Sequence, residues 1–597
     1  MQITLDEMIQ RVKESEAKIH ESPETLAMLQ RTADVITDMA RDSKKITVLT
    51  DYDADGITSA YIIQKTLETL NPECEIDVRP NDRRGAYGLS ADTIQHISSQ
   101  MKDDEIENVI VLDMGTNQIP EIEKCDTFNN HILIIDHHLI DIENAERHSD
   151  IKNKVLNDPA YCNCHVISDN DKENAQYCTA GLAYRMYELT GCKDIADEKQ
   201  NNTVLAIAAI GTASDMVDVL DENSFNRDIL KAGVAVVDEA TPENFNHVVG
   251  YMLSKVAISS ETTAHELAFN AGAFLNAGGR MSEVIEENGA ARIYKALTAP
   301  ENEVSSYLEI DKLQVINTAR KDLVKSIVNS PEYLEQLEAE RFGDRAENNI
   351  AIVTLPNDTP HSFAGLVAAK FEESADKTVI CLTQNTKTGN WSGSARNPET
   401  NNFSLMEFMQ SALDGADIDI KYGGHSNAMG VSSLSDKDFE KFKALIIEKA
   451  AELPNHGKKS QEEIVTVPVS EFTAPDAISK IKELEPIGIG LQLPSAKLEG
   501  EFKGTSPISK TGSNNWKNVK IRQEGVDYSV KDWSYDERAY IPDDNKKIGM
   551  TAEVSISTFR GEHVEFTVKF DRADYLNKLN EHEINSPELA EKTDIQP

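Results

Sequence analysis

The sequence predicts an α/β protein in which two α/β lobes are joined by a helical connector and followed by a small β barrel. Three observations support this fold class. Short apolar runs rich in Val and Ile alternate with helical patterns in two parts of the chain, a long helical stretch separates those parts, and apolar and polar residues alternate near the C-terminus. A chain of 597 residues also exceeds what one hydrophobic core usually supports, so several domains are expected.

The first lobe, residues 46–235, follows a charged, helix-prone leader at residues 1–45. Its predicted strands are apolar runs without polar alternation, which is typical of strands buried on both faces of a parallel sheet. These runs are Ile46–Leu49, Val109–Leu112 and Ile132–Ile135. A helical pattern over Ile57–Leu67 follows the first run and gives the order strand, acidic loop, helix.

The remaining parts follow from changes in pattern and from the Pro, Gly and polar residues that mark loops. Helical spacing of apolar residues fills the connector, and the second lobe opens with the apolar run 349–355. Residues 516–522 and 565–570 alternate as strands of an antiparallel barrel do, consistent with an OB fold. The predicted parts are the connector 236–345, the second α/β lobe 346–450, a linker and return segment 451–500, the OB-like barrel 501–572 and a polar tail 573–597.

Acidic residues close each predicted strand of the first lobe. The first run is followed by Asp51, Asp53 and Asp55, the second by Asp113, and the third by Asp136, His137 and His138. Ligands of open α/β sheets bind at the carboxyl ends of the strands, so these side chains are expected to gather there. Carboxylates and imidazoles make a site suited to Mn²⁺ or Mg²⁺. The pattern predicts a metal-dependent phosphoesterase.

Two simpler interpretations of these acids are weaker. The spacing from Asp51 to Gly56 matches the first half of an EF-hand loop, but that loop needs a Glu at its twelfth position, where this chain has Ile62, and it needs a helix before it. Isolated acids near strand ends are usually solvated turn residues. Three such ends in one sheet, one with adjacent histidines, favour a functional site.

The same motifs resemble the DHH phosphoesterase superfamily. The resembling segments are Asp51-Tyr-Asp-Ala-Asp-Gly56, Asp113, Asp136-His-His138 and Ile210-Gly-Thr-Ala-Ser-Asp215. Phe274-Leu-Asn276-Ala-Gly-Gly-Arg280 is similar to a segment of RecJ exonucleases, and Glu483-Leu-Glu-Pro-Ile-Gly488 to the segment that leads into their nucleic-acid-binding domain. Ser392-Gly-Ser394-Ala-Arg396 and Gly423-Gly424-His425 resemble substrate-binding motifs of the associated DHHA1 domain.

The resemblance implies a site with two Mn²⁺ or Mg²⁺ ions. Its implied ligands are Asp53, Asp55, Asp113, His137 and Asp215, with Asp113 as the bridge. Asp51, Asp136 and His138 are the other catalytic candidates. Asp136 is expected to orient the adjacent imidazole, and His138 to contact the scissile phosphate or protonate the leaving oxygen. The alternative for His138 is a structural histidine that caps the strand end.

Recognition of the substrate is expected from the connector and the second lobe. The candidates are Asn276, Arg280, Ser394, Arg396, Gly423, Gly424 and His425. Guanidinium groups grip phosphate bidentately, so Arg280 and Arg396 suit a terminal 5′-phosphate, whereas ordinary ion pairing is the alternative for each. The arginines of the family's Pro-x-Arg segment are displaced here, at Arg83 and Arg84, so either one is a candidate for a further phosphate contact.

Composition adds expectations about compartment and binding. Seven scattered cysteines, no secretory leader and no long apolar run predict a cytoplasmic protein without a membrane span. Cys162, Cys164, His165 and Cys178 provide four zinc-ligand types, but their spacing fits no common zinc motif and favours reduced thiols. The net charge of −42 argues against a broad electrostatic clamp on DNA, although residues 501–572 hold 12 Lys and Arg against 12 Asp and Glu.

Three classes of function remain open at this stage. The first, which the resemblance favours, is a 5′→3′ exonuclease that acts on single-stranded DNA, in DNA repair, recombination or replication, with single-strand-binding protein or a helicase as a partner. The second is a DHH phosphodiesterase of short oligoribonucleotides or cyclic dinucleotides, and the third is a non-catalytic replication scaffold. In the barrel, stacking aromatics and cations are the expected DNA contacts. These candidates are Trp516, Tyr528, Trp533, Phe559, Lys517, Lys520, Arg522 and Arg560, with barrel core as the alternative for half of the aromatics.

Overall fold

The computed structural model describes most of the chain and divides it into two units. The described residues are 2–85, 88–102, 105–140, 145–168, 173–256, 258, 262–343, 345, 348–375, 377–398, 401–424, 426–453, 466–493, 495–507, 509–511, 514–532, 547–557 and 563–568. One unit comprises Arg11–Leu323 together with Glu485–Gln492, and the other comprises Met1–Gln10, Val324–Leu484 and Leu493–Pro597. No helix among the described residues is both long and apolar enough to cross a membrane.

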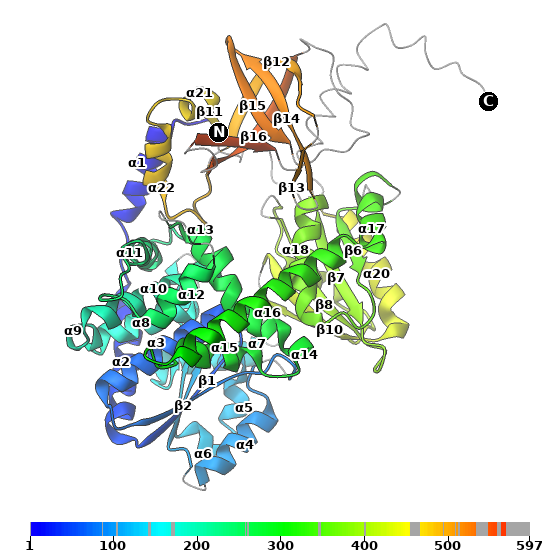
Figure 1. Cartoon of the computed structure of the whole chain (residues 1–597). Helices are drawn as coiled ribbons and strands as arrows, with labels where there is room; N and C mark the ends of the chain where they lie inside the picture. Colours follow the sequence, from blue (N-terminus) through cyan, green and yellow to red (C-terminus); the bar gives the residue numbers. More distant parts are fainter. Residues whose placement is uncertain are drawn as a thin grey trace. The chain divides into compact units, whose positions relative to one another are not determined.

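The first lobe is built on a parallel sheet whose strand order is β2-β1-β3-β4-β5. Figure 1 labels β1 and β2 of this sheet. The strands are β1 (Lys45–Thr50), β2 (Glu75–Pro80), β3 (Asn108–Leu112), β4 (Ile132–Ile135) and β5 (Tyr161–Cys162). The chain passes from β1 outward to β2 and then returns to β3 on the other side of β1. Right-handed crossovers therefore place α3 (Ala54–Leu70) and α4 (Ala91–Lys102) on opposite faces of the sheet. The switch point, where such sheets bind ligands, lies between β1 and β3.

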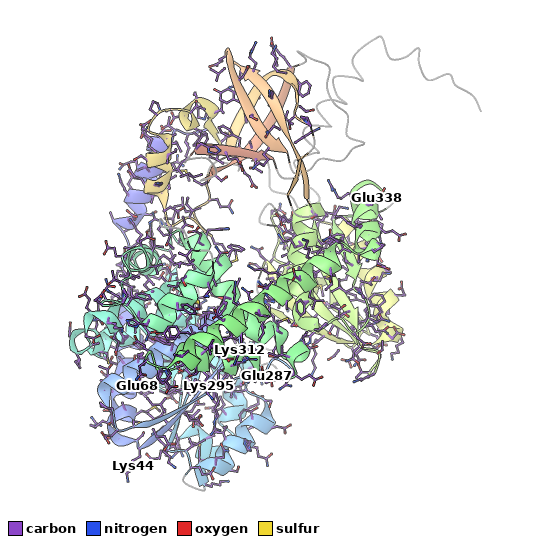
Figure 2. The ribbon with its side chains drawn as sticks, in the orientation of Figure 1. Lys44, Glu68, Glu287, Lys295, Lys312 and Glu338 are labelled. Carbon is purple, nitrogen blue, oxygen red and sulfur yellow. The ribbon has the colours of Figure 1, made fainter. Side chains whose placement is uncertain are left out.

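Helices surround this sheet and continue into the predicted connector. The longer ones are α1 (Leu5–Glu16), α2 (Pro23–Asp42), α7 (Ala145–Asn157), α8 (Thr179–Leu189), α10 (Glu198–Ser214), α11 (Asn226–Asp238), α12 (His247–Lys255), α14 (Ala273–Ile285), α15 (Gly289–Leu297), α16 (Val304–Val328) and α17 (Pro331–Phe342). Short ones are α5 (Ile119–Ile122), α6 (Asp126–Asn129), α9 (Cys192–Ile195) and α13 (Ala264–Glu266). Arg292 of α15 pairs with Glu287 and with Glu309 of α16, and Glu309 also pairs with Lys312. Figure 2 labels Glu287 and Lys312.

The second lobe has a mixed sheet with the order β6-β7-β8-β10-β9. Its strands are β6 (Ile350–Thr354), β7 (Thr378–Gln384), β8 (Trp391–Arg396), β9 (Lys421–Gly424) and β10 (Ala428–Leu434), and its helices are α18 (Ala364–Ala375), α19 (Leu405–Leu413) and α20 (Asp436–Ala451). Only the β6–β7 pair is parallel among these pairings of described residues. A hydrophobic core that includes Ile380, Met409 and Phe442 fixes the sheet under α19 and α20.

A closed barrel follows, and it confirms the predicted fold class. Its strands are β12 (Ser495–Thr505), β14 (Asn514–Gln523), β15 (Val526–Asp532), β16 (Lys547–Ser557) and β17 (His563–Val568). β12 pairs with both β14 and β16, and the ring closes through a parallel β15–β17 pair, the strand connectivity of an OB fold. The barrel starts at residue 495, before the expected residue 501. Shorter elements beside these are β11 (Thr466–Pro468), α21 (Val469–Phe472), α22 (Ala477–Leu484) and β13 (Ser509–Thr511).

The barrel candidates for DNA contacts divide by burial. Tyr528 packs edge-on against Phe566 and is only 7% exposed, so it belongs to the barrel core rather than to a stacking surface. Lys517 is buried as well, whereas Lys520 is exposed and Arg522 pairs with Asp527. Trp533, Phe559 and Arg560, the side chain of Trp516 and the predicted tail lie outside what the structure describes.

Candidate metal centre

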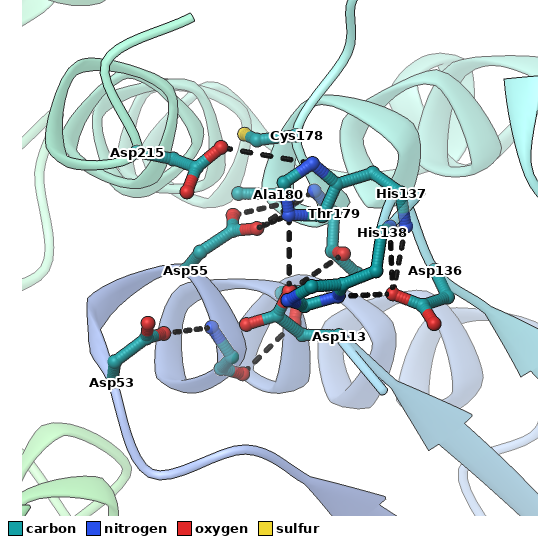
Figure 3. Close-up of polar contacts among 12 residues, drawn as sticks. Asp53, Asp55, Asp113, Asp136, His137, His138, Cys178, Thr179, Ala180 and Asp215 are labelled. Carbon is teal, nitrogen blue, oxygen red and sulfur yellow. Dashed lines mark hydrogen bonds and ion pairs between the residues drawn. The ribbon is translucent and has the colours of Figure 1, made fainter. Parts of the chain in front are cut away.

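The acidic residues of the first lobe gather at the switch point of the sheet (Figure 3). Asp51 follows β1, and Asp53 caps α3 by accepting a hydrogen bond from the backbone N of Gly56 at 3.1 Å. Gly56 is required there, because a Cβ at this position would lie 2.6 Å from the carbonyl oxygen of Asp51. Asp113 follows β3 in a left-handed conformation with φ of 60°, which Asp tolerates better than most residues. Asp215 ends α10.

The N-terminus of α8 holds Asp55 in place. Asp55 Oδ2 accepts from the backbone N of Thr179 at 2.8 Å, and Oδ1 accepts from the backbone N of Ala180 at 2.7 Å. These amides have no partner within the helix, and the helix dipole favours a negative charge at this end. Thr179 also donates its hydroxyl to Asp113 Oδ1 at 3.2 Å. Sequence reasoning missed Thr179, because nothing local links it to residues so far away in the chain.

The imidazole of His137 lies between three carboxylates. Its Nε2 is 3.4 Å from Asp113 Oδ1 and 3.8 Å from Asp55 Oδ2, and its Nδ1 is 3.7 Å from Asp215 Oδ2. The ligand atoms form three groups, each within 4.8 Å. The groups are Asp51-Asp53-Asp113, Asp55-His137-Asp215 and Asp113-His137-His138. Asp113 and His137 each belong to two groups, so the donor set can hold two neighbouring cations.

The electrostatics of this cluster favour bound cations. Burial, and then repulsion from Asp53, raise the pKa of Asp51 to about 8 and that of Asp215 to about 7. Burial and repulsion also raise the pKa of Asp113 well above its usual value. One oxygen of Asp51, Oδ1, is buried and has no hydrogen-bond partner among the described residues. Buried carboxylates that repel each other, together with an imidazole nitrogen, fit hard divalent ions such as Mn²⁺ or Mg²⁺.

Asp136 and His138 form a separate hydrogen-bonded pair. Asp136 Oδ1 accepts from the backbone N atoms of His137 and His138 and from Nδ1 of His138 at 2.8, 3.2 and 2.7 Å. Its Oδ2 accepts from the backbone N of Thr116 at 2.9 Å. Burial alone would lower the pKa of His138, but the charge of Asp136 and this hydrogen bond raise it to about 9. Both oxygens of the Asp136 carboxylate accept hydrogen bonds, and one of these bonds orients the imidazole of His138.

A buried asparagine supports this pair from behind. Asn163 Nδ2 donates to the carbonyl oxygen of His138 at 2.8 Å and to Oγ1 of Thr116 at 3.1 Å. Thr116 and His138 are both partners of Asp136, so one amide fixes both of their segments. Sequence reasoning had placed the flanking Cys162 and Cys164 in a possible zinc set and had passed over Asn163.

The described cysteines do not assemble with His165 into a metal site. His165 places Nε2 2.9 Å from the carbonyl oxygen of Tyr177, and Cys178 caps α8 through the backbone N of Gly181. The candidate metal groups of the described residues contain no cysteine. These positions are those of buried, reduced thiols.

Two of the expected substrate residues lie on α14 beside the acidic loop. Asn276 Oδ1 accepts from the backbone N of Ala54 at 3.0 Å, which ties α14 to the start of α3. Burial raises the pKa of the half-buried Tyr52 to about 12, and the positive charge of Arg280, one turn after Asn276, acts to lower it. The guanidinium of Arg83 lies 4.6 Å from the centre of the Tyr52 ring, whereas Arg84 is paired with Asp82. Of the two displaced arginines, Arg83 is therefore the one at the site.

The second lobe brings Ser394 and Arg396 together on β8. Arg396 Nη1 donates to Ser394 Oγ at 2.8 Å, and a Cβ on Gly365, at the N-terminus of α18, would lie 2.9 Å from Arg396 Nη2. A guanidinium and a hydroxyl are thus adjacent beside the first turn of α18, which is a chemistry that suits phosphate. Gly423 and Gly424 lie on β9, Gly424 with φ of 146°, and His425 falls outside the described residues.

Comparisons with known proteins agree with this architecture. The sequence profile of the DHH family, N-terminal domain, matches residues 45–212, and that of the DHHA1 domain matches residues 347–452. The chain is 24% identical over 488 residues to the single-stranded-DNA-specific exonuclease RecJ of Bacillus subtilis, a match that covers 81% of this chain and 56% of that relative. It is 24% identical over 419 residues to a prophage-derived protein of Bacillus subtilis named as a single-strand DNA-specific exonuclease, covering 67% of this chain and 65% of that one.

A solved structure shows the same fold. RecJ from Thermus thermophilus in complex with Mn²⁺ superposes with a TM-score of 0.65 at 19% identity, over 91% of this chain and 71% of that one. The matches to the Bacillus relatives span less than two thirds of those relatives' own length.

Proposed function

We propose that this chain, which carries the DHH and DHHA1 domains and is similar to RecJ, is a metal-dependent exonuclease that hydrolyses single-stranded DNA from the 5′ end and releases 5′-mononucleotides. The observation that carries the proposal is the metal centre itself. The buried carboxylates of Asp55 and Asp113 lie beside His137 at the switch point of the sheet. Asp51, which is grouped with Asp113, is also buried and has one oxygen unpaired among the described residues. A scaffold without catalysis would gain nothing from burying so much unbalanced charge.

In this proposal the ligands are the five residues that the family resemblance implies. They are Asp53, Asp55, Asp113, His137 and Asp215, with Asp113 shared between two ions. Support for this ligand set comes from the three overlapping groups of ligand atoms. The bound ions, Mn²⁺ or Mg²⁺, would supply a nucleophilic water and would neutralise charge on the phosphate. Asp51, whose Oδ1 is unpaired among the described residues, could complete one ion's coordination.

The protein's own residues then orient the phosphodiester and move a proton. Asp136 engages Nδ1 of His138, which leaves Nε2 as the atom to protonate the leaving 3′-oxygen. Burial lowers the pKa of His138, but the charge of Asp136 and this hydrogen bond raise it, so the pair favours the protonated imidazole. Thr179 holds Asp113 and Asp55 at fixed positions, so the geometry exists before substrate arrives.

Selection of the 5′ end is assigned to the second lobe. Arg396 and Ser394, next to the N-terminus of α18, are the groups suited to a terminal phosphate. Gly423 and Gly424 would allow a close backbone approach beside them. Asn276 and Arg280 are assigned to the strand near the metals, and the barrel is assigned to the single strand beyond them. Single-strand-binding protein or a helicase remains the proposed type of partner.

The second candidate is a phosphodiesterase of short oligoribonucleotides or cyclic dinucleotides. The metal centre and the phosphate groups of the second lobe would serve that reaction as well. The closed OB-like barrel favours the exonuclease, because a small substrate has no need of an additional domain that binds strands.

The test is digestion of a single strand labelled at either end, with Mn²⁺ present. Labelled mononucleotide should appear first from the 5′-labelled strand, while a duplex of the same sequence resists. An Arg396→Ala variant should lose its preference for 5′-phosphate over 5′-hydroxyl ends but keep hydrolysis. Early release from the 3′ end, or rapid cleavage of dinucleotides with no action on long strands, would refute the proposal.

A further inference from the structure

Within the predicted linker and return segment 451–500, the residues Glu485–Gln492 belong by their contacts to the unit that contains the metal centre. From here on, the name return segment means these residues alone. Leu484 before it and Leu493 after it both belong to the other unit. The chain therefore returns to the unit with the metal centre for these residues alone. The sequence here includes part of the motif Glu483-Leu-Glu-Pro-Ile-Gly488, to which the proposed function gives no role. The contacts of the return segment indicate what it does.

A fully buried arginine anchors the start of the return segment. Arg227, in the first turn of α11, is 1% exposed. Its Nη2 donates to the carbonyl oxygen of Glu485 at 3.0 Å, and its Nη1 donates to that of Pro486 at 2.9 Å. Its Nε donates to Glu16 at 2.6 Å. A buried guanidinium without such acceptors would be strongly destabilising, so the carbonyl oxygens of the return segment are part of the folded unit.

The rest of the return segment packs on the loop that follows Asp215. Gly488 and Leu491 close a tight turn through two backbone hydrogen bonds of 2.9 and 3.1 Å, and Ile489 accepts from the backbone N of Val219 at 2.9 Å. Gly490 has φ of 82° and lies so close to Asp218 that a Cβ would be 1.8 Å from Asp218 Oδ1. Only glycine fits this position, for reasons of both backbone conformation and space.

This loop supports the metal centre from two directions. Asp218 is three residues after Asp215, and its Oδ1 accepts a hydrogen bond from the backbone N of Leu220 at 2.7 Å. Asp221 Oδ2 accepts from the backbone N of Gln176 at 2.8 Å, just before the Thr179 and Ala180 amides that hold Asp55. Asp55 and Asp215 belong to the same group of ligand atoms. The loop is joined to Asp215 directly along the chain, and it is linked to Asp55 through Gln176 and the start of α8.

We propose that the return segment positions Asp215 and Asp55 by clamping residues 218–221, and that it thereby sets the affinity of the metal centre. The proposal rests on the proposed metal-dependent function. It assigns the motif at residues 485–488 to the positioning of metal ligands rather than to contact with nucleic acid. Groups that orient metal ligands from behind typically change metal affinity by 10- to 100-fold when they are mutated.

The test is calorimetric titration of Mn²⁺ into the metal-free, full-length protein and its variants. Gly490→Ala should weaken Mn²⁺ binding by about 10- to 100-fold, because the added Cβ displaces Asp218. Gly191→Ala is the matched control, since Gly191 has a similar φ of 78° and nothing within 4 Å of an added Cβ. It should bind Mn²⁺ within about twofold of the wild type. Adding Asp218→Ala to Gly490→Ala makes room for the new methyl and should recover part of the affinity.

A measurement on the wild type covers the case in which Gly490→Ala fails to fold. Coupling between two sites is reciprocal, so Mn²⁺ should slow amide hydrogen exchange in the return segment as well as at residues 215–222. Unchanged Mn²⁺ affinity in folded Gly490→Ala, or no added protection of the return segment, would overturn the inference. A wild-type protein that binds no Mn²⁺ would instead overturn the proposed function, so the two failures are distinguishable.

Discussion

Replacing Asp136 by Asn should separate the orientation of His138 from the binding of metal. Asp136 receives four donors, three at Oδ1 and the backbone N of Thr116 at Oδ2. An asparagine that keeps its oxygen toward the three donors turns its NH₂ toward Thr116. The reverse orientation turns the NH₂ toward His137 and His138 and is worse. Asp136→Asn therefore leaves at least one buried amide unpaired.

The expected loss of stability in Asp136→Asn follows from the number of unpaired amides. One buried donor without a partner costs about 1–3 kcal/mol of unfolding free energy. For the reaction, His138 loses both the charge that holds its proton and a fixed ring position. Groups that orient a site from behind usually change activity by 10- to 100-fold, which corresponds to about 1.4–2.7 kcal/mol in the activation barrier.

The assay is single-turnover hydrolysis of a 5′-labelled single strand at saturating Mn²⁺, with Mn²⁺ affinity measured separately. Asp136→Asn should slow the chemical step by about 10- to 100-fold and leave Mn²⁺ affinity within a few-fold of the wild type. The double variant with His138→Ala should be no slower than His138→Ala alone, because both changes remove one function. A full rate in Asp136→Asn, or additive losses in the double variant, would refute the role assigned to this pair.

Three further outcomes are expected. Asp113→Ala should abolish hydrolysis with Mn²⁺ present while the circular dichroism spectrum stays native, and appreciable activity would remove the two-metal mechanism. Deleting residues 493–597 removes the barrel but keeps the return segment, so cleavage of short oligonucleotides should persist while processivity on long strands falls; unchanged processivity would exclude the barrel as the tether. Burial would raise the pKa of Glu16, but Lys231 and Arg227 lower it below 4.5, so its stabilising contribution is complete above that pH and is lost as the pH falls through the lowered pKa. The stability difference between wild type and Glu16→Gln, from urea unfolding, should shrink as the pH falls below 4.5, and a constant difference would contradict this.

The amino-acid pattern predicted the strands that are buried on both faces of the sheet. The runs that became β1, β3 and β4 are buried and, apart from Thr47, apolar, because helices cover both faces of the sheet. β2 was not predicted, since it lies at the edge of the sheet and its residues alternate between exposed and partly buried positions. The OB-like barrel was predicted from alternation, but Tyr528 shows that alternation does not tell which aromatic faces inward.

The sequence predicted only those residues of the candidate site that directly follow a strand. Asp51, Asp113 and Asp136 stand at strand ends, so their meeting at one edge follows from a parallel sheet. The residues that hold them come from far away in sequence. Thr179 reaches Asp55 across 124 positions, and Asn276 reaches Ala54 across 222. No spacing rule links such pairs, because only the tertiary fold brings them together.

The amides around Asp55 and Asp136 have a practical consequence for work with the isolated protein. Both carboxylates are fixed by backbone N–H groups of Thr179, Ala180, Thr116 and the histidines, not by the ions that the centre would hold. Metal removal should therefore empty a preformed cage without unfolding the lobe, in contrast to small zinc domains that collapse when chelated. The same preparation can then be stripped with a chelator and refilled with one cation after another. Differences in turnover between those cations would report on the ions themselves, with the polypeptide held constant.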